Sequence, residues 1–229
     1  MLTIKEIANN AANTPTWGLR GALAAVAAAL ALAGCSALPA PPARADVYDF
    51  GPGALAAGPA DRRAPLPPIA LPEVAVAGPV EGSTAVLYRL AYDDPRRLRP
   101  YGQARWSQPP AQLVQQALRD ELGQRRAVLM GDEGVSQLVA SGQPPVVLRA
   151  EIEEFSQVFQ STRQSAGLLR LRASLSEPTA AGEKLLAQRV FVVQRPAPTP
   201  DARGGTRALA EAAAQAAREV GGWVEQVGR

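Results

Sequence analysis

The chain contains no histidine and only one cysteine among its 229 residues. Without histidine it has no imidazole general base, no Ser-His-Asp triad and no histidine-ligated metal site. With the single cysteine, Cys35, it forms no internal disulfide. We therefore expect no cofactor and no metal, and we expect the folded part to be held together by packing.

Lysine and aromatic residues are also scarce. Two of the 24 basic residues are lysines, and aromatic residues make up 5% of the chain. No block of like charges occurs, and the aromatic residues are too few to form a stacking surface for bases. The sequence therefore argues against a nucleic-acid partner.

The most informative segment is the one that leads to Cys35. An apolar run of small residues, Gly21–Ala33, follows Arg20 and continues into Leu32-Ala-Gly-Cys35. Such a run is too short for a membrane span of about 20 residues and is typical of a secretory signal. Its ending resembles a bacterial lipobox, in which the cysteine sulfur receives diacylglycerol and the chain is cut before the cysteine. We predict lipidation at Cys35, the alternative being an ordinary signal peptide with a chance cysteine.

The chain then divides into three parts. Residues 1–34 are the predicted lipoprotein signal peptide, residues 35–45 an Ala/Pro-rich tether, and residues 46–229 a single domain. The tether is stiffened by proline into an extended form of about 3.1 Å per residue. After residue 34 the chain carries 22 basic and 20 acidic groups, which is close to balance.

Short runs rich in β-formers predict a sheet. The stretch Val146–Phe155 alternates apolar with polar side chains, which indicates a sheet with one polar, solvent-facing side. The stretch Leu185–Val193 is apolar on both faces in its later half and is predicted to be a central strand. The other predicted strands are Asp46–Gly51, Ile69–Gly78, Ala85–Tyr92, Leu98–Trp106 and Leu168–Ser176.

Two segments have the 3.6-residue apolar period of an amphipathic helix. The first begins near Ser107, a candidate cap, and ends near Gly123. The second is Thr206–Val227, with Leu209, Val220 and Trp223 on its apolar stripe. Together with the strands they predict an α/β or α+β layered domain, a mixed sheet packed by two helices.

The order of several short motifs resembles the ABC-type transport auxiliary lipoprotein family, whose PqiC-like members are partners of MCE lipid transport systems. The resemblance covers about Val47 to Val227. The motifs are Tyr48-Asp-Phe-Gly51, Tyr88-Arg-Leu90, Trp106-Ser-Gln-Pro-Pro110, Leu148-Arg-Ala-Glu-Ile-Glu-Glu-Phe155, Leu186-Ala-Gln-Arg-Val-Phe191 and the closing alanine-rich helix with Trp223.

The resemblance implies a lipoprotein of the outer membrane that faces the periplasm. Such a protein serves with an inner-membrane ABC transporter and a membrane-anchored MCE protein in lipid transport between membranes, and a homo-oligomer is compatible with that role. The implied fold is similar to the amino-terminal domain of TolB. The family brings no catalytic residues, which agrees with the absence of histidine.

Two groups of residues are candidates for a functional site. Tyr88, Tyr92, Tyr101 and Trp106 gather with several arginines in the predicted hairpin, a composition that protein interfaces favour. They are either partner-binding residues or aromatics packed on the local core. Glu151 and Glu153 project from one strand face and could form a hydrolytic pair, but a solvated strand face explains them as well.

Three functions remain open at this stage. The first is a non-enzymatic, lipid-anchored component of an ABC/MCE lipid transport system. The second is a structural lipoprotein of envelope assembly, unrelated to transport. The third is a lipid-anchored periplasmic hydrolase that uses carboxylates.

Overall fold

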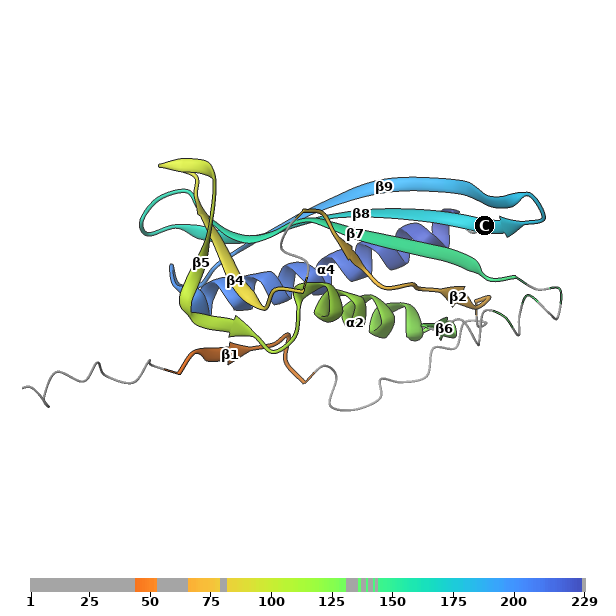
Figure 1. Cartoon of the computed structure of the whole chain (residues 1–229), viewed down its shortest axis with the longest axis horizontal. Coiled ribbons are helices and arrows are strands. Elements are labelled where there is room, and N and C mark those ends of the chain that lie inside the picture. The colour runs from red at the N-terminus through yellow and green to blue at the C-terminus, as the bar shows by residue number, and fades with distance from the viewer. Residues whose placement is uncertain are drawn as a thin grey trace, which may run out of the picture. The chain divides into compact units, whose positions relative to one another are not determined.

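The computed structural model describes residues 44–52, 66–78, 82–130, 136, 139, 142 and 144–227. These residues belong to one compact unit, Arg44–Arg229, and contain nine strands and two helices (Figure 1). In chain order they are β1 Asp46–Tyr48, β2 Ile69–Ala70, β3 Ala75–Val76, β4 Ala85–Leu90, β5 Asp94–Trp106, α2 Pro110–Gly123, β6 Val128–Leu129, β7 Val146–Phe159, β8 Ser165–Thr179, β9 Gly182–Pro196 and α4 Ala202–Val227. A mixed sheet with both helices on one face confirms the predicted layered α/β domain.

Strand β7 is the centre of the sheet. On one edge it pairs antiparallel with β8, and β8 pairs antiparallel with β9. On its other edge the short strands β2 and β3 and the end of β4 follow one another, all parallel to β7. The segment predicted as one strand, Ile69–Gly78, therefore forms two short strands along the same neighbour.

Strand β9 does not have the central place predicted for Leu185–Val193. Within the described part of the chain it pairs only with β8. Phe191 and Val193 are 2% exposed and face α4, whereas Val192 is 57% exposed on the opposite side of the strand. The apolar run is thus buried on one face only, which is why it is compatible with an edge position.

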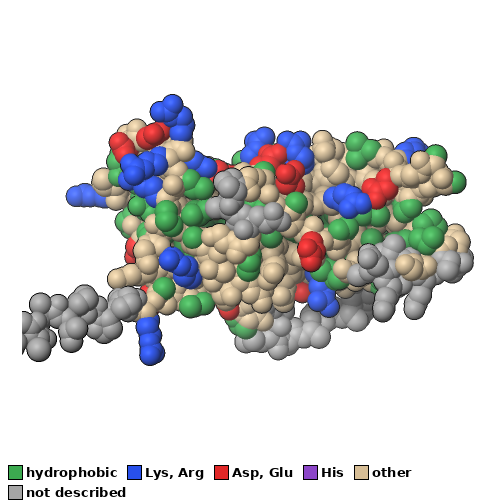
Figure 2. Space-filling view, in the orientation of Figure 1, with side chains coloured by type: hydrophobic (Ala, Val, Ile, Leu, Met, Phe, Trp, Pro, Cys, Tyr) green, Lys and Arg blue, Asp and Glu red, His purple; other side chains and the backbone are tan. Residues whose placement is uncertain are grey.

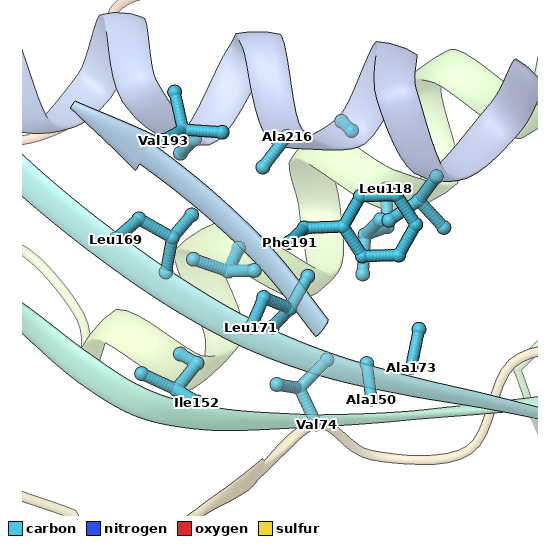
Figure 3. Packing of buried hydrophobic residues seen from close by; sticks show 14 of the residues in the cluster. Val74, Leu118, Ala150, Ile152, Leu169, Leu171, Ala173, Phe191, Val193 and Ala216 are labelled. Atoms are coloured by element: carbon cyan, nitrogen blue, oxygen red, sulfur yellow. The ribbon is translucent and has the colours of Figure 1, made fainter. Parts of the chain in front are cut away.

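The hydrophobic core lies between the sheet and the helices. Leu169 and Leu171 of β8, together with Phe191 of β9, point toward the helices in Figure 3. The apolar stripe predicted for the last helix meets them: Leu209, Ala216 and Val220 are at most 1% exposed. Apolar surface buried at this interface stabilises the fold by about 25 cal/mol per Å². This burial is the main stabilising contribution of the described contacts.

Helix α4 begins four residues before the predicted start at Thr206. The side chain of Asp201 accepts hydrogen bonds from the backbone N–H of Gly204 (2.8 Å) and from the Thr199 hydroxyl (2.7 Å), as an N-cap does. The first of these bonds is the main cause that lowers the pKa of Asp201. A Cβ at Gly204 would lie 2.1 Å from the Thr199 carbonyl oxygen, so this turn requires glycine.

Helix α2 has the predicted extent but not the predicted cap. Pro109 occupies the cap position, and no side chain of the described residues caps the helix. Pro110 stands in the first turn, where proline is tolerated because an N–H there would have no partner within the helix. The backbone N–H of Ser107 instead donates to the Tyr48 carbonyl (2.7 Å). Ser107 therefore joins β5 to β1 and does not cap the helix.

The sheet face away from the helices is polar, as the alternation predicted. Ion pairs join the strands across it: Glu153 of β7 pairs with Arg170 and Arg172 of the neighbouring β8. Arg149 of β7 pairs with Glu183 of β9, across the intervening β8. Strand β7 bulges between Ile152 and Glu154, which places two consecutive carboxylates, Glu153 and Glu154, among these pairs. This face is exposed to solvent, and ion pairs connect its strands.

Candidate functional site

The predicted lipidation site, Cys35, lies outside the described residues, which begin at Arg44. The signal peptide and most of the tether lie outside them as well, so their boundaries stay predictions. Among the described helices none has an apolar stretch long enough to cross a bilayer.

The four predicted partner-binding aromatics do not form one exposed patch. Trp106 is 2% exposed and packs against Phe50 and Phe155, each with ring centroids 5.6 Å away. It is a core residue and offers no docking surface. Tyr92, in the turn between β4 and β5, is 49% exposed and is the one of the four that fits the prediction.

Tyr88 and Tyr101 are half-buried and pack on each other at 4.6 Å between ring centroids. The Tyr101 hydroxyl donates to Oε1 of Gln157 (2.8 Å), and Nε2 of Gln157 donates to the Ser165 hydroxyl (2.7 Å). Burial is the main cause that raises the pKa of Tyr101, so its hydroxyl remains a neutral donor at physiological pH. Through these contacts Tyr88 of β4 and Tyr101 of β5 tie the hairpin to the end of β7.

The arginines of the β4–β5 hairpin divide into those that brace it and those that face solvent (Figure 2). Arg89 forms a two-pronged ion pair with Glu154, with distances of 2.9 and 2.8 Å, and also donates to the Pro95 carbonyl. Arg99 pairs with Asp93 at 3.0 Å. By contrast, the guanidinium of Arg97 has no ion pair or hydrogen bond with any residue that the structure describes.

Of the two carboxylates that could form a hydrolytic pair, Glu153 is held by Arg170 and Arg172, whereas Glu151 has no ion pair with the described residues. The hydrogen bond from Arg170 is the main cause that lowers the pKa of Glu153, and Arg172 acts in the same direction. A general acid needs a raised pKa near the working pH, which is the opposite shift. Among the described residues no group of three potential ligands could hold a metal ion. The described geometry thus supports a structural role for Glu153.

A mainly apolar cleft of about 240 Å³ opens where β4 separates from β7. Leu87, Leu98 and Pro109 form part of its walls, and the Arg89–Glu154 pair lies beside it. The acidic and basic groups that line it are already engaged in ion pairs. Among the described residues that line the cleft, no free acid, base and nucleophile lie together for a reaction.

The sequence analysis did not identify Gln157 and Gly205, which organise this region. Gln157 is fully buried and joins Tyr101 to Ser165, and a Cβ at Gly205 would lie 1.9 Å from its Oε1. Gln157 follows three other polar residues in the second half of its strand, Glu153, Glu154 and Ser156, so its polarity gave no distinct signal. The partners lie far apart in sequence, so the sequence alone does not show the connection.

Two solved structures share this fold with TM-scores above 0.5. A crystal structure of a DUF330-family protein from Xanthomonas campestris superposes with a TM-score of 0.60 at 19% identity, covering 73% of this chain and 90% of that one. The crystal structure of an uncharacterized protein gives 0.54 at 12% identity, covering 79% and 99%. These identities establish the fold alone. A comparison with curated protein sequences gives no match.

A family model settles the relationship. The model of the ABC-type transport auxiliary lipoprotein component matches residues 48–221, which is nearly the whole described domain from β1 into α4. The motifs from Tyr48 to Phe191 fall in this range, and the match extends into the closing helix as far as residue 221, short of Trp223. The chain belongs to the family of ABC-type transport auxiliary lipoprotein components.

Proposed function

We propose that the chain is a non-enzymatic, lipid-anchored component of an ABC/MCE-type lipid transport system. In this proposal the lipid at Cys35 holds it in the outer membrane, the domain faces the periplasm, and it docks a periplasm-spanning MCE partner. The observation that carries the proposal is the family match over residues 48–221. The name of that family supports an auxiliary role in ABC transport, and the MCE partner is the finer step that experiment must test.

The described site supports a docking role better than a catalytic one. Glu153 and Glu154, which line the largely apolar cleft, are both paired with arginines. The described hydroxyl in the lining, that of Ser83, accepts from the backbone N–H of Ala85 and has no carboxylate partner among the described residues. A docking protein requires only a stable surface held in the right place, and the braced hairpin and cross-linked sheet offer one.

Replacing Glu151 and Glu153 together by glutamine is expected to leave function within about twofold of the wild type. No proton transfer is assigned to either carboxylate, and glutamine keeps their shape. The measurement is complementation of a deletion strain, with circular dichroism to confirm folding. The matched control is Glu177→Gln with Glu183→Gln, two carboxylates of β8 and β9 that, like Glu153, form ion pairs. A folded Glu151/Glu153 variant without function, beside an active control, would contradict the non-enzymatic assignment.

Genetic interaction separates the transport proposal from the structural alternative. If the chain acts only with the transporter, deleting its gene and deleting the MCE gene should give the same detergent sensitivity, and the double deletion should be no more sensitive. A structural lipoprotein of envelope assembly predicts additive defects instead. Additive defects would therefore overturn the transport proposal in favour of that alternative.

A further inference from the structure

One end of the domain carries an excess of positive charge. The turn between β4 and β5 and the turn between β7 and β8 lie at this end, at the left of Figure 1. The two turns with the start of β5 hold four arginines, Arg96, Arg97, Arg99 and Arg163, and two aspartates, Asp93 and Asp94. This excess equals the whole net charge of the chain after residue 34, so the rest of the domain is balanced.

The two turns are neighbours in the fold. The end of β4 pairs in parallel with the end of β7, with Leu90 opposite Phe159. The backbone N–H of Ala91 then donates to the Phe159 carbonyl (2.8 Å). The positive charges of the arginines in both turns therefore lie at the same part of the surface.

Several of these arginines are available to a ligand outside the domain. The side chain of Arg96 is 91% exposed although it pairs with Asp94 at 3.2 Å. The exposed guanidinium groups of Arg97 and Arg163 form no hydrogen bond or ion pair with the described residues. Guanidinium groups bind phosphate oxygens in two-pronged geometry, and an exposed tyrosine such as Tyr92 is a residue type that favours membrane interfaces.

The tether joins the domain at the same end. Strand β1 begins at the left of Figure 1, below the two turns, where Asp46 pairs with Ala104 near the end of β5, and the exposed Arg44 stands just before it. From Cys35 to Arg44 the chain has nine residue steps, which reach about 28 Å at about 3.1 Å per step. A tether of that length holds this end near the bilayer and makes even a weak contact with it effectively intramolecular.

We propose that this basic end, defined as Tyr92, Arg96, Arg97 and Arg163, contacts the anionic phospholipid surface of the membrane that holds the lipid anchor. The surface attracts the guanidinium groups, and the contact orients the domain so that the opposite end projects away from the bilayer. This inference rests on the proposed lipid anchoring. A protein with an acidic surface could also attract these charges, and the experiment distinguishes the two.

The test uses residues 44–229, which contain every residue of the buried core and form one compact unit. Without an acyl chain, this fragment reports the surface contact separately from the anchor. Its binding is measured by co-sedimentation with phosphatidylcholine vesicles that contain 30% phosphatidylglycerol, beside vesicles of phosphatidylcholine alone. Each arginine near an anionic surface contributes about fivefold to partitioning at low salt, and the contribution falls as salt screens it.

The triple variant Arg96→Gln, Arg97→Gln, Arg163→Gln is expected to bind the anionic vesicles about 100-fold more weakly than the wild type. The matched control, Arg119→Gln, Lys184→Gln, Arg218→Gln, removes the same charge from exposed sites on α2, β9 and α4 and should keep most of the binding. Asp93→Asn should strengthen binding severalfold, a gain that a folding defect cannot imitate.

Three results would overturn the inference. One is no binding of the wild-type fragment to anionic vesicles at low salt. Another is an equal loss in both triple variants, which would mean that only net charge matters. The third is unchanged vesicle binding by the basic-end variant when the same changes in the full chain abolish recovery of a partner protein, which would make this end a protein-docking surface. Failure of the Cys35 anchor alone would leave the vesicle results in place, so the two proposals fail separately.

Discussion

Replacing Gly167 by alanine is expected to lower the free energy of unfolding by about 3 kcal/mol, near the upper part of the usual range for overpacking a core. A Cβ at this position of β8 would lie 2.6 Å from the backbone nitrogen of Leu209 and 2.7 Å from the carbonyl carbon of Ala208. Both atoms belong to the backbone of α4, so no side-chain rotation relieves the clash. The helix would have to move off the sheet that it covers. Thermal or urea unfolding of the purified domain measures the effect.

Gly102→Ala is the matched control for this change. Gly102 also lies in a strand, β5, but a Cβ there would meet no atom within 4 Å, and its backbone does not require glycine. Its effect on unfolding is expected to stay within about 0.5 kcal/mol. If both variants had the same free energy of unfolding as the wild type, α4 could not lie as close to β8 as the structure places it.

Replacing Cys35 by serine is expected to abolish acylation and to release the protein from the membrane. A serine hydroxyl does not replace the thiol that forms the thioether with diacylglycerol. A single acyl chain gives only marginal membrane binding, whereas two or more anchor a protein stably, so the processed wild type should not detach measurably. Labelling with radioactive palmitate and fractionation of membranes measure both effects.

The control for this prediction is Ser36→Ala, which should label and fractionate like the wild type. Ser36 stands where an aspartate would retain an enteric-type lipoprotein at the inner membrane, so a density gradient should place the wild type in the outer membrane. Palmitate labelling that persists in the Cys35→Ser protein would refute the lipid anchor. A clean inner-membrane profile of the wild type would refute only the outer-membrane placement.

The sequence predicted those elements whose pattern directly reports their surroundings. Alternation along β7 showed a core face with Leu148 and Ile152 and a charged face with Arg149, and both are observed. The stripe of α4 through Leu209 and Val220 was equally informative, because a long helix on a sheet buries one side only. Local periodicity therefore sufficed for the layers of the fold.

Features that depend on distant contacts were not predictable. The sequence did not show that Trp106 packs against Phe155, or that Tyr101 meets Gln157, because these partners are about 50 residues apart. Glycine in pairs usually interrupts a helix, so Gly204 gave no sign of the first turn of α4; the cap at Asp201 and the crowding against Thr199 explain it only in three dimensions.

The placement of β9 failed for a different physical reason. Apolar residues on both faces indicate a strand buried on both sides, and this led to the prediction of a central strand. The structure leaves Val192 and Leu185 more than half exposed on β9. The sequence pattern does not show whether an apolar side chain of a strand is exposed or buried. An edge strand with exposed apolar residues therefore looks the same in sequence as a central strand.

Isolation of the chain with its partners tests the central claim most directly. The protein carrying a C-terminal affinity tag is purified from detergent-solubilised membranes, and the proteins that accompany it are identified by quantitative mass spectrometry against an untagged strain. The account predicts enrichment of an MCE protein, together with the ATPase and permease of its ABC transporter. Recovery of the acylated protein in good yield without any of these components would contradict it.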